Sequence, residues 1–83
     1  MIVQLSRREA HVAALLSAAP GPLSRWQLID AMQLGFEDDG VVRLHICRLR
    51  DKLGDDAIRT LRGVGYELTD AGRKALKQLE MAA

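Results

Sequence analysis

The fold is decided by the stretch from Asp39 to Tyr66, DGVVRLHICRLRDKLGDDAIRTLRGVGY. Its first half repeats apolar residues at helical spacing, and at 100° per residue they fall within a stripe about 60° wide. These residues are Val42, Ile46, Leu49 and Leu53. Asp38 or Asp39 can cap a helix over residues 39–53, and Gly54 can end it. The opposite side carries small, apolar and basic residues: Gly40, Leu44, Cys47, Arg48 and Asp51, flanked by Val41 and Arg43.

The second half of the stretch changes its period from helical to alternating. Residues 58–62 and 66–68 alternate apolar and polar side chains, and Gly63-Val64-Gly65 lies between them. This pattern predicts a β-hairpin with a glycine-rich tip. Arg62 is expected at that tip.

Two helices are predicted upstream, each from a capping box in which a serine hydroxyl and a Glu or Gln side chain satisfy backbone amides reciprocally. The boxes are residues 6–9, SRRE, and 24–27, SRWQ. The first helix runs to about Ala18, before Pro20 and Pro22. The second is expected to stop near Leu34-Gly35 and to place Trp26 in the core, with Leu23 and Leu28 as a hydrophobic staple. Downstream, Thr69 or Asp70 can cap a last helix, whose leucines are expected to close the core.

The composition is that of one small globular domain over residues 1–83, with a core in 5–68 and a helical extension in 69–83. Apolar residues make up 48% of the chain and charged residues 28%. A single cysteine, Cys47, excludes an internal disulfide framework, and no apolar run approaches the ~20 residues of a membrane span. We therefore expect a cytoplasmic protein. With two separated histidines and no phosphate-binding loop, we expect no metal, no cofactor and no enzymatic activity.

Positive charge is concentrated in the same decisive stretch. The net charge of the chain is +1, but residues 40–66 hold six basic and three acidic residues. A segregated positive surface suits a polyanionic partner. Three helices followed by a hairpin is the layout of a winged helix-turn-helix domain, whose third helix can enter the major groove of DNA.

The residues then resemble a known family. Residues 44–55, LHICRLRDKLGD, and 58–66, IRTLRGVGY, closely resemble the DNA-binding effector domain of OmpR/PhoB-type response regulators. Residues 5–9, LSRRE, and 23–28, LSRWQL, match the segments that precede these motifs in the family. The resemblance implies a mainly α fold with a small β-hairpin (α+β): a three-helix core, a wing and, here, an extra C-terminal helix. It also implies a bacterial transcription regulator that binds double-stranded DNA sequence-specifically.

The resemblance assigns roles position by position. It places Arg48 and Leu44 at base edges in the major groove, with Val41, Arg43 and Cys47 beside them. It implies phosphate contacts for His45, Arg50, Thr60 and Tyr66, and a minor-groove contact for Arg62. Simpler readings stay open: Arg48 as a solvated arginine, Arg50 paired with an acid, and His45 and Tyr66 as packing residues. Cys47 can be a small residue that permits close approach.

Several features depart from the family and leave alternatives open. The family domain normally follows a receiver domain and a small antiparallel sheet, whereas this sequence begins almost at the first predicted helix, so we do not expect control by a phospho-acceptor. The loop of residues 34–39 is short and lacks tryptophan, which leaves contact with RNA polymerase open. Homodimers or tandem binding on DNA are also open. Two alternative functions remain: an architectural DNA-bending factor of excisionase type, and a winged-helix module that binds a protein.

Overall fold

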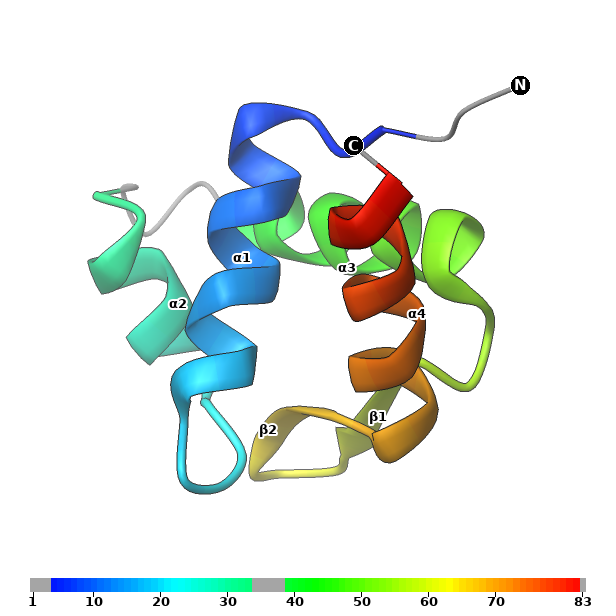
Figure 1. Cartoon of the computed structure of the whole chain (residues 1–83). Helices are drawn as coiled ribbons and strands as arrows, with labels where there is room; N and C mark the ends of the chain where they lie inside the picture. The colour runs from blue at the N-terminus through cyan, green and yellow to red at the C-terminus, as the bar shows by residue number, and fades with distance from the viewer. Residues whose placement is uncertain (1–3, 34–38, 83) are drawn as a thin grey trace.

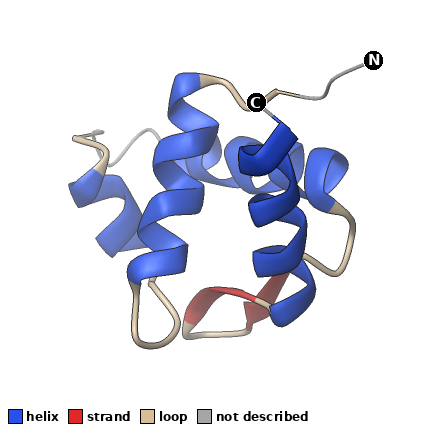
Figure 2. Ribbon diagram, in the orientation of Figure 1, coloured by secondary structure: helices blue, strands red, loops and turns tan. Residues whose placement is uncertain are grey.

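A computed structural model of the chain describes residues 4–33 and 39–82 and contains four helices and a two-stranded antiparallel sheet in those ranges. The order is α1 (Arg7–Ala18), α2 (Arg25–Ala31), α3 (Asp39–Leu53), β1 (Ile58–Leu61), β2 (Gly65–Leu68) and α4 (Asp70–Ala82). In Figure 1, α1 stands between α2 and α4, α3 crosses behind α1 and α4, and the hairpin closes the lower end. Figure 2 shows how little of the fold is strand. The predicted α+β winged-helix layout is confirmed.

Both predicted capping boxes are formed. The amide of Glu9 donates to the Ser6 hydroxyl at 3.2 Å while the Ser6 amide donates to the Glu9 carboxylate at 2.7 Å. Ser24 and Gln27 exchange the same two bonds at 3.1 and 2.8 Å. Each box satisfies amides that a helix start would otherwise leave without an intrahelical partner. The starts of α1 and α2 are therefore fixed by local sequence.

Two expectations for α2 were wrong. The helix ends at Ala31, before the expected end near Leu34-Gly35, and Gln33 takes a left-handed conformation (φ 59°); Leu34 and Gly35 lie outside the described residues. Trp26 is 47% exposed and is not in the core. Leu28 and Ile29 are buried, and Trp26 lies about 110° around the helix from the direction between them. Its ring instead carries the Arg25 guanidinium, 4.8 Å from the ring centroid.

The core is built from aliphatic side chains of α1, α2, α3 and the hairpin. Its buried members are Val12, Ala13, Leu16, Leu28, Ile29, Val42, Ile46, Leu49, Ala57, Ile58 and Leu68. The predicted α3 stripe is confirmed: Val42, Ile46 and Leu49 are at most 2% exposed, and Leu53 packs against the cluster. Burial of this stripe fixes the rotation of α3 about its axis and hence which side chains point outward.

The hairpin is joined to the helices by a bridge that the sequence did not predict. β2 begins at Gly65, one residue earlier than expected, with Leu61 opposite Gly65 and Ile58 opposite Leu68. On the other edge of β2, Leu23 and Tyr66 exchange two backbone hydrogen bonds of 2.9 and 2.8 Å. Gly65 permits this approach, since a Cβ there would lie 2.0 Å from the Leu23 carbonyl oxygen. The segment before α2 therefore holds the hairpin at the start of β2, close to its turn.

The C-terminal helix packs on the core through part of its length. Thr69 caps α4 by accepting from the Gly72 amide at 3.1 Å, and Leu76 packs against the core cluster, as predicted. The Arg73 guanidinium donates to the Ser17 carbonyl of α1 at 3.0 Å. A cavity of about 520 Å³ remains between α1 and α4. No helix in the described ranges has the length and apolar character that crossing a membrane requires.

Candidate nucleic-acid interface

The outward side of α3 gathers four of the predicted base-contacting residues. Arg43, Leu44, Cys47 and Arg48 are all exposed, and Leu44 retains 46% of its accessible surface. Residues three and four apart are neighbours on a helix surface, so these side chains form one contiguous patch. Val41 lies at its margin and is half-buried. The patch combines two cations with two small or aliphatic side chains, which suits base edges and the thymine methyl group.

His45 lies on the inner margin of α3. It is 7% exposed, and its Nδ1 lies 2.7 Å from the Val41 carbonyl oxygen. Because a carbonyl can only accept, Nδ1 carries the proton in this contact. The ring is thereby held by its own helix and packed, which agrees with the simpler of the two readings that the sequence left open.

Arg50 links α3 to the first strand of the hairpin. Its Nε and Nη2 donate to the Ile58 carbonyl at 3.1 and 2.8 Å, and Nη2 also donates to the Thr60 hydroxyl at 2.7 Å. The partner is thus a backbone carbonyl and a hydroxyl, where the simpler of the two open readings had an acid. Two of the predicted phosphate-contacting residues, Arg50 and Thr60, therefore touch each other and set the position of β1 relative to α3. Tyr66, a third, is half-buried against the core.

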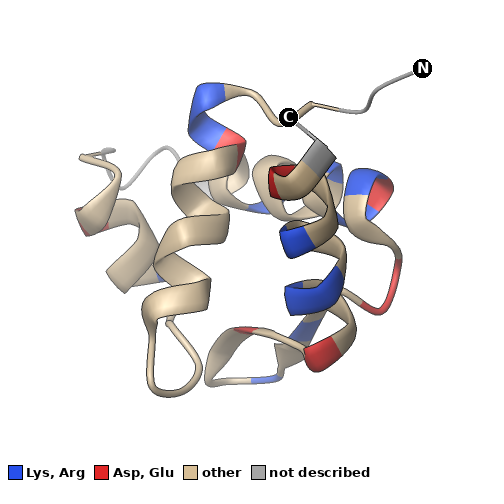
Figure 3. Ribbon diagram, viewed as in Figure 1, with Lys and Arg blue, Asp and Glu red and all other residues tan. Residues whose placement is uncertain are grey.

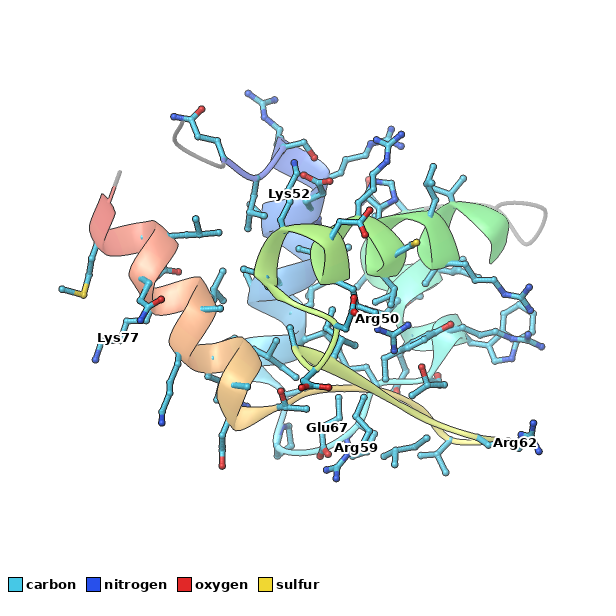
Figure 4. The ribbon with its side chains drawn as sticks, turned by 90° about the vertical axis from the view of Figure 1, so that its right-hand side faces the viewer. Arg50, Lys52, Arg59, Arg62, Glu67 and Lys77 are labelled. Carbon is cyan, nitrogen blue, oxygen red and sulfur yellow. The ribbon has the colours of Figure 1, made fainter. Side chains whose placement is uncertain are left out.

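Arg62 occupies the tip of the hairpin. It is exposed, is followed by Gly63 at a positive φ of 76°, and projects away from the body of the protein in Figure 4. Below the tip, Arg59 forms an ion pair with Glu67, its register partner on β2. Within residues 4–33 and 39–82, Arg62 at the far end of the hairpin has no acidic partner, whereas Arg59 is paired. In Figure 4, Lys77 of α4 lies on the opposite side of the view.

A second cavity, of about 420 Å³, lies between the start of α2, α3 and the hairpin. Its lining comprises Ser24, Arg25, Trp26, Arg43 and residues 60–66. It includes three arginines, and none of its described lining residues is acidic. The sequence did not indicate a role for Arg25, and Trp26 was expected in the core. A tryptophan directly after a cationic residue at a helix start was the available signal, but it did not reveal which way the ring faces.

A partly buried ion pair holds the C-terminal end of α3 against α1. Lys52 donates to the Glu9 carboxylate at 2.6 Å and to the Gln4 carbonyl at 2.9 Å, and the Glu9 side chain is 2% exposed. Burial by itself raises the pKa of the Glu9 carboxyl, but hydrogen bonds from Lys52 and Ser6 outweigh it and leave the pKa below its ordinary value. Glu9 is therefore ionised at neutral pH and holds Lys52 on the α1 side.

Charge is unevenly distributed over the elements. Figure 3 shows basic segments on α3, α4 and the hairpin, whereas α1 carries no charge after its first turn. The patch on α3, the hairpin tip and the cavity between them thus form one continuous basic surface, since the cavity lining includes both Arg43 and Arg62. Such a surface attracts a polyanion and leaves an apolar centre for closer contact.

Comparison with known proteins places this geometry in context. The model of the family described as "Transcriptional regulatory protein, C terminal" matches residues 2–68, which end with β2 and leave α4 outside the match. The transcriptional regulatory protein CseB of Streptomyces coelicolor is 42% identical over 69 residues, covering 80% of this chain and 30% of that protein. No solved structure matches the chain.

Two further relatives match the chain over a similar number of residues. The regulatory protein VanRB of Enterococcus faecalis is 36% identical over 70 residues, covering 81% of this chain and 32% of that protein. The response regulator protein PmrA of Pseudomonas aeruginosa is 39% identical over 67 residues, covering 77% and 30%. The chain therefore spans about a third of the length of these curated relatives.

Proposed function

Because the chain belongs to the family of C-terminal domains of transcriptional regulatory proteins, DNA-binding domains of bacterial regulators, we propose that it recognises duplex DNA sequence-specifically through α3 and the hairpin. The observation that carries this proposal is the division of α3 into two sides. Val42, Ile46 and Leu49 are sealed in the core, and the patch of Arg43, Leu44, Cys47 and Arg48 is exposed. The named regulators among the relatives favour this function over a DNA-bending factor or a protein-binding module.

In the proposed complex, α3 lies in the major groove, which is wide enough to admit a helix. Arg48 donates to base edges, with guanine as the acceptor that suits a bidentate arginine best. Leu44 and Cys47 permit close approach and contact apolar base surface, and Arg43 and Val41 lie at the border of the patch. The hairpin follows the adjoining backbone, and Arg62 enters the minor groove, whose negative potential attracts arginine.

Phosphate contacts position the domain without reading sequence. We assign them to Thr60, the Tyr66 hydroxyl and Arg50. Since Arg50 already bonds Ile58 and Thr60, it contributes both to the α3–β1 junction and, through its remaining N–H groups, to the backbone. The same assignment for His45 has the least support, because its Nδ1 is engaged and its ring is buried.

The partners of the whole protein follow from the same family membership. Its relatives are named as regulators and are about three times longer than this chain. We therefore propose that the domain works as part of a regulator, that it contacts RNA polymerase, and that it binds DNA as a homodimer or in tandem. We also propose that the domain acts in the cytoplasm and has no enzymatic activity of its own. Its role is then to select a DNA site.

The test is selection of bound duplexes from a random-sequence pool, followed by titration of the selected duplex at several salt concentrations. We expect one recoverable motif, and a log–log slope of affinity against salt near −4 to −5, as for about four to six phosphate contacts. Arg48→Ala should weaken binding by about 1–3 kcal/mol and relax the preference at one base pair. Lys77→Ala removes a charge on α4 and is the control. Absence of any motif, or equal effects of the two variants, would refute sequence-specific recognition by α3.

A further inference from the structure

The cavity of about 520 Å³ between α1 and α4 takes no part in the proposed DNA interface. Its described lining shares no residue with the patch on α3, with the hairpin or with the second cavity. α4 follows the part of the chain that the family model matches, and Figure 1 shows it beside α1. The cavity therefore depends on a helix that lies outside the matched domain.

The space between the two helices remains because α4 is held closely only at its beginning. A Cβ on Gly72 would lie 2.2 Å from the Ala57 carbonyl oxygen, and the Thr69 hydroxyl donates to the same oxygen at 3.0 Å. Arg73 then donates to the Ser17 carbonyl of α1 at 3.0 Å. Along the cavity, α1 contributes only small side chains, which leave the space unfilled: Ala10, Ala13, Ala14, Ser17 and Ala18.

The cavity has the lining of a site for a small organic molecule. Apolar side chains dominate it, because Leu5, Leu76 and Leu79 complete the surface that the alanines begin. Leu76 packs against the core cluster, whereas Leu79 is half-buried and is not among the described residues that pack there. Ligand sites typically measure about 300–1,000 Å³ and combine an apolar lining with a few polar groups. The polar groups here come from Gln4, Ser17 and Glu80.

Charge indicates which kind of molecule suits this cavity. Glu80 is the one charged residue of the described lining, and it forms no ion pair within residues 4–33 and 39–82. It lies in the last turn of α4, which holds no basic residue, and the C-terminal end of a helix carries partial negative charge. Lys77, three residues earlier on α4, does not line the cavity. The Glu80 end of the cavity therefore favours a cation and disfavours a carboxylate.

We propose that this cavity binds a small hydrophobic amine. Its apolar body lies between the alanines of α1 and the leucines of α4, and its ammonium group lies at the Glu80 carboxylate. The apolar body supplies most of the affinity, because it covers apolar side chains that water otherwise contacts. Glu80 supplies selectivity for the amine, since an exposed ion pair adds little affinity. This inference goes beyond the proposed function and does not depend on it.

Three matched probes that share one compact hydrocarbon body test the proposal: adamantylamine, adamantanol and adamantane carboxylate. Each is titrated into the full chain at neutral pH, and two-dimensional amide NMR spectra record which residues respond. We expect the amine to bind with a dissociation constant on the order of 0.1–1 mM, as for a ligand of this size, and to shift the amide signals of α1 and α4. The alcohol should bind about twofold to fivefold more weakly than the amine, and the carboxylate more weakly still.

Variants identify the site and the group that selects the amine. Ala14→Leu places a larger side chain in the cavity from an exposed position on α1, and should weaken amine binding by about tenfold or more because it occupies the space of the ligand. Ala71→Leu makes the same change at an exposed position of α4 outside the lining and is the matched control. Glu80→Gln should reduce the affinity for the amine to that for the alcohol and leave the affinity for the alcohol unchanged. Circular dichroism verifies that each variant is folded.

Amine binding that is confined to α1 and α4, is lost in Ala14→Leu and loses its preference over the alcohol in Glu80→Gln supports the proposal. If no probe shifts these helices, or if Ala14→Leu binds the amine as tightly as the parent, the proposal is wrong. A preference for the amine that persists in Glu80→Gln contradicts the place given to the ammonium group. If analytical ultracentrifugation shows a dimer that Ala14→Leu abolishes, a second copy of the chain fills the cavity and the proposal is overturned. These measurements contain no DNA, so their outcome is independent of the proposed function.

Discussion

Substituting Gly65 by alanine should loosen the hairpin from the helices. The new Cβ would lie 2.0 Å from the Leu23 carbonyl oxygen and 2.6 Å from its carbon, so the backbone must separate. Separation breaks the two hydrogen bonds between Leu23 and Tyr66, each worth about 0.5–1.5 kcal/mol. The positive φ of 152° adds about 1 kcal/mol or more for a residue with a side chain. The expected loss is about 2–5 kcal/mol, a large part of the stability of a domain this small.

Gly63→Ala is the matched control. Gly63 also has a positive φ, 76°, but a Cβ there meets nothing within 4 Å. This variant should lose only the free energy that the left-handed backbone costs a residue with a Cβ, about 1 kcal/mol. In both variants alanine also lowers the conformational entropy of the unfolded chain by a similar amount, so this effect cancels in the comparison. Urea unfolding followed by circular dichroism gives the free energies of unfolding. If the two alanine variants differ by less than about 0.5 kcal/mol, the close approach of Leu23 does not hold the hairpin.

Three other substitutions test contacts between elements. The stability difference between the parent protein and Glu9→Gln should be largest near neutral pH and should vanish as pH falls through the folded-state pKa of Glu9. Because that pKa is lowered, the ion pair stabilises the protein above the ordinary carboxyl pKa and is lost in acid. Urea unfolding at a series of acidic pH values measures this difference. Lys52→Met should lower the free energy of unfolding by about 2 kcal/mol near neutral pH, because it leaves the Glu9 carboxylate buried without its cation. A variant as stable as the parent would show that this ion pair does not stabilise the fold. Arg50→Met should both destabilise the fold, by about 1–3 kcal/mol, and weaken DNA binding, while a pure phosphate contact would change DNA binding alone.

The features that sequence predicted well are those that depend on neighbours along the chain. Capping boxes involve residues three apart, and the stripe of α3 follows from helical periodicity, so both were confirmed in detail. The outward patch followed in turn, because burying one side of α3 exposes the other. The order of three helices and a hairpin indicated the winged-helix layout, and the motifs in residues 44–55 and 58–66 indicated the family.

The features that sequence did not predict depend on contacts between distant segments. Nothing local to Leu23 indicates that its backbone pairs with Tyr66, and neither reading of Arg50, as a phosphate contact or as the partner of an acid, indicated its bonds to the Ile58 carbonyl. Trp26 was placed inside because it is large and apolar, whereas Leu28 and Ile29 determine which side of the short α2 faces the core. Tertiary packing decided each of these positions.

The central claim is that the outward side of α3 lies against DNA, and Cys47 tests it directly. It is the single cysteine of the chain, it is exposed, and it lies within the patch. The rate of Cys47 alkylation by a maleimide is measured with and without a saturating amount of the selected duplex. The account predicts strong protection by DNA that disappears at high salt, where the complex dissociates. An alkylation rate that is unchanged while the duplex is fully bound would contradict it.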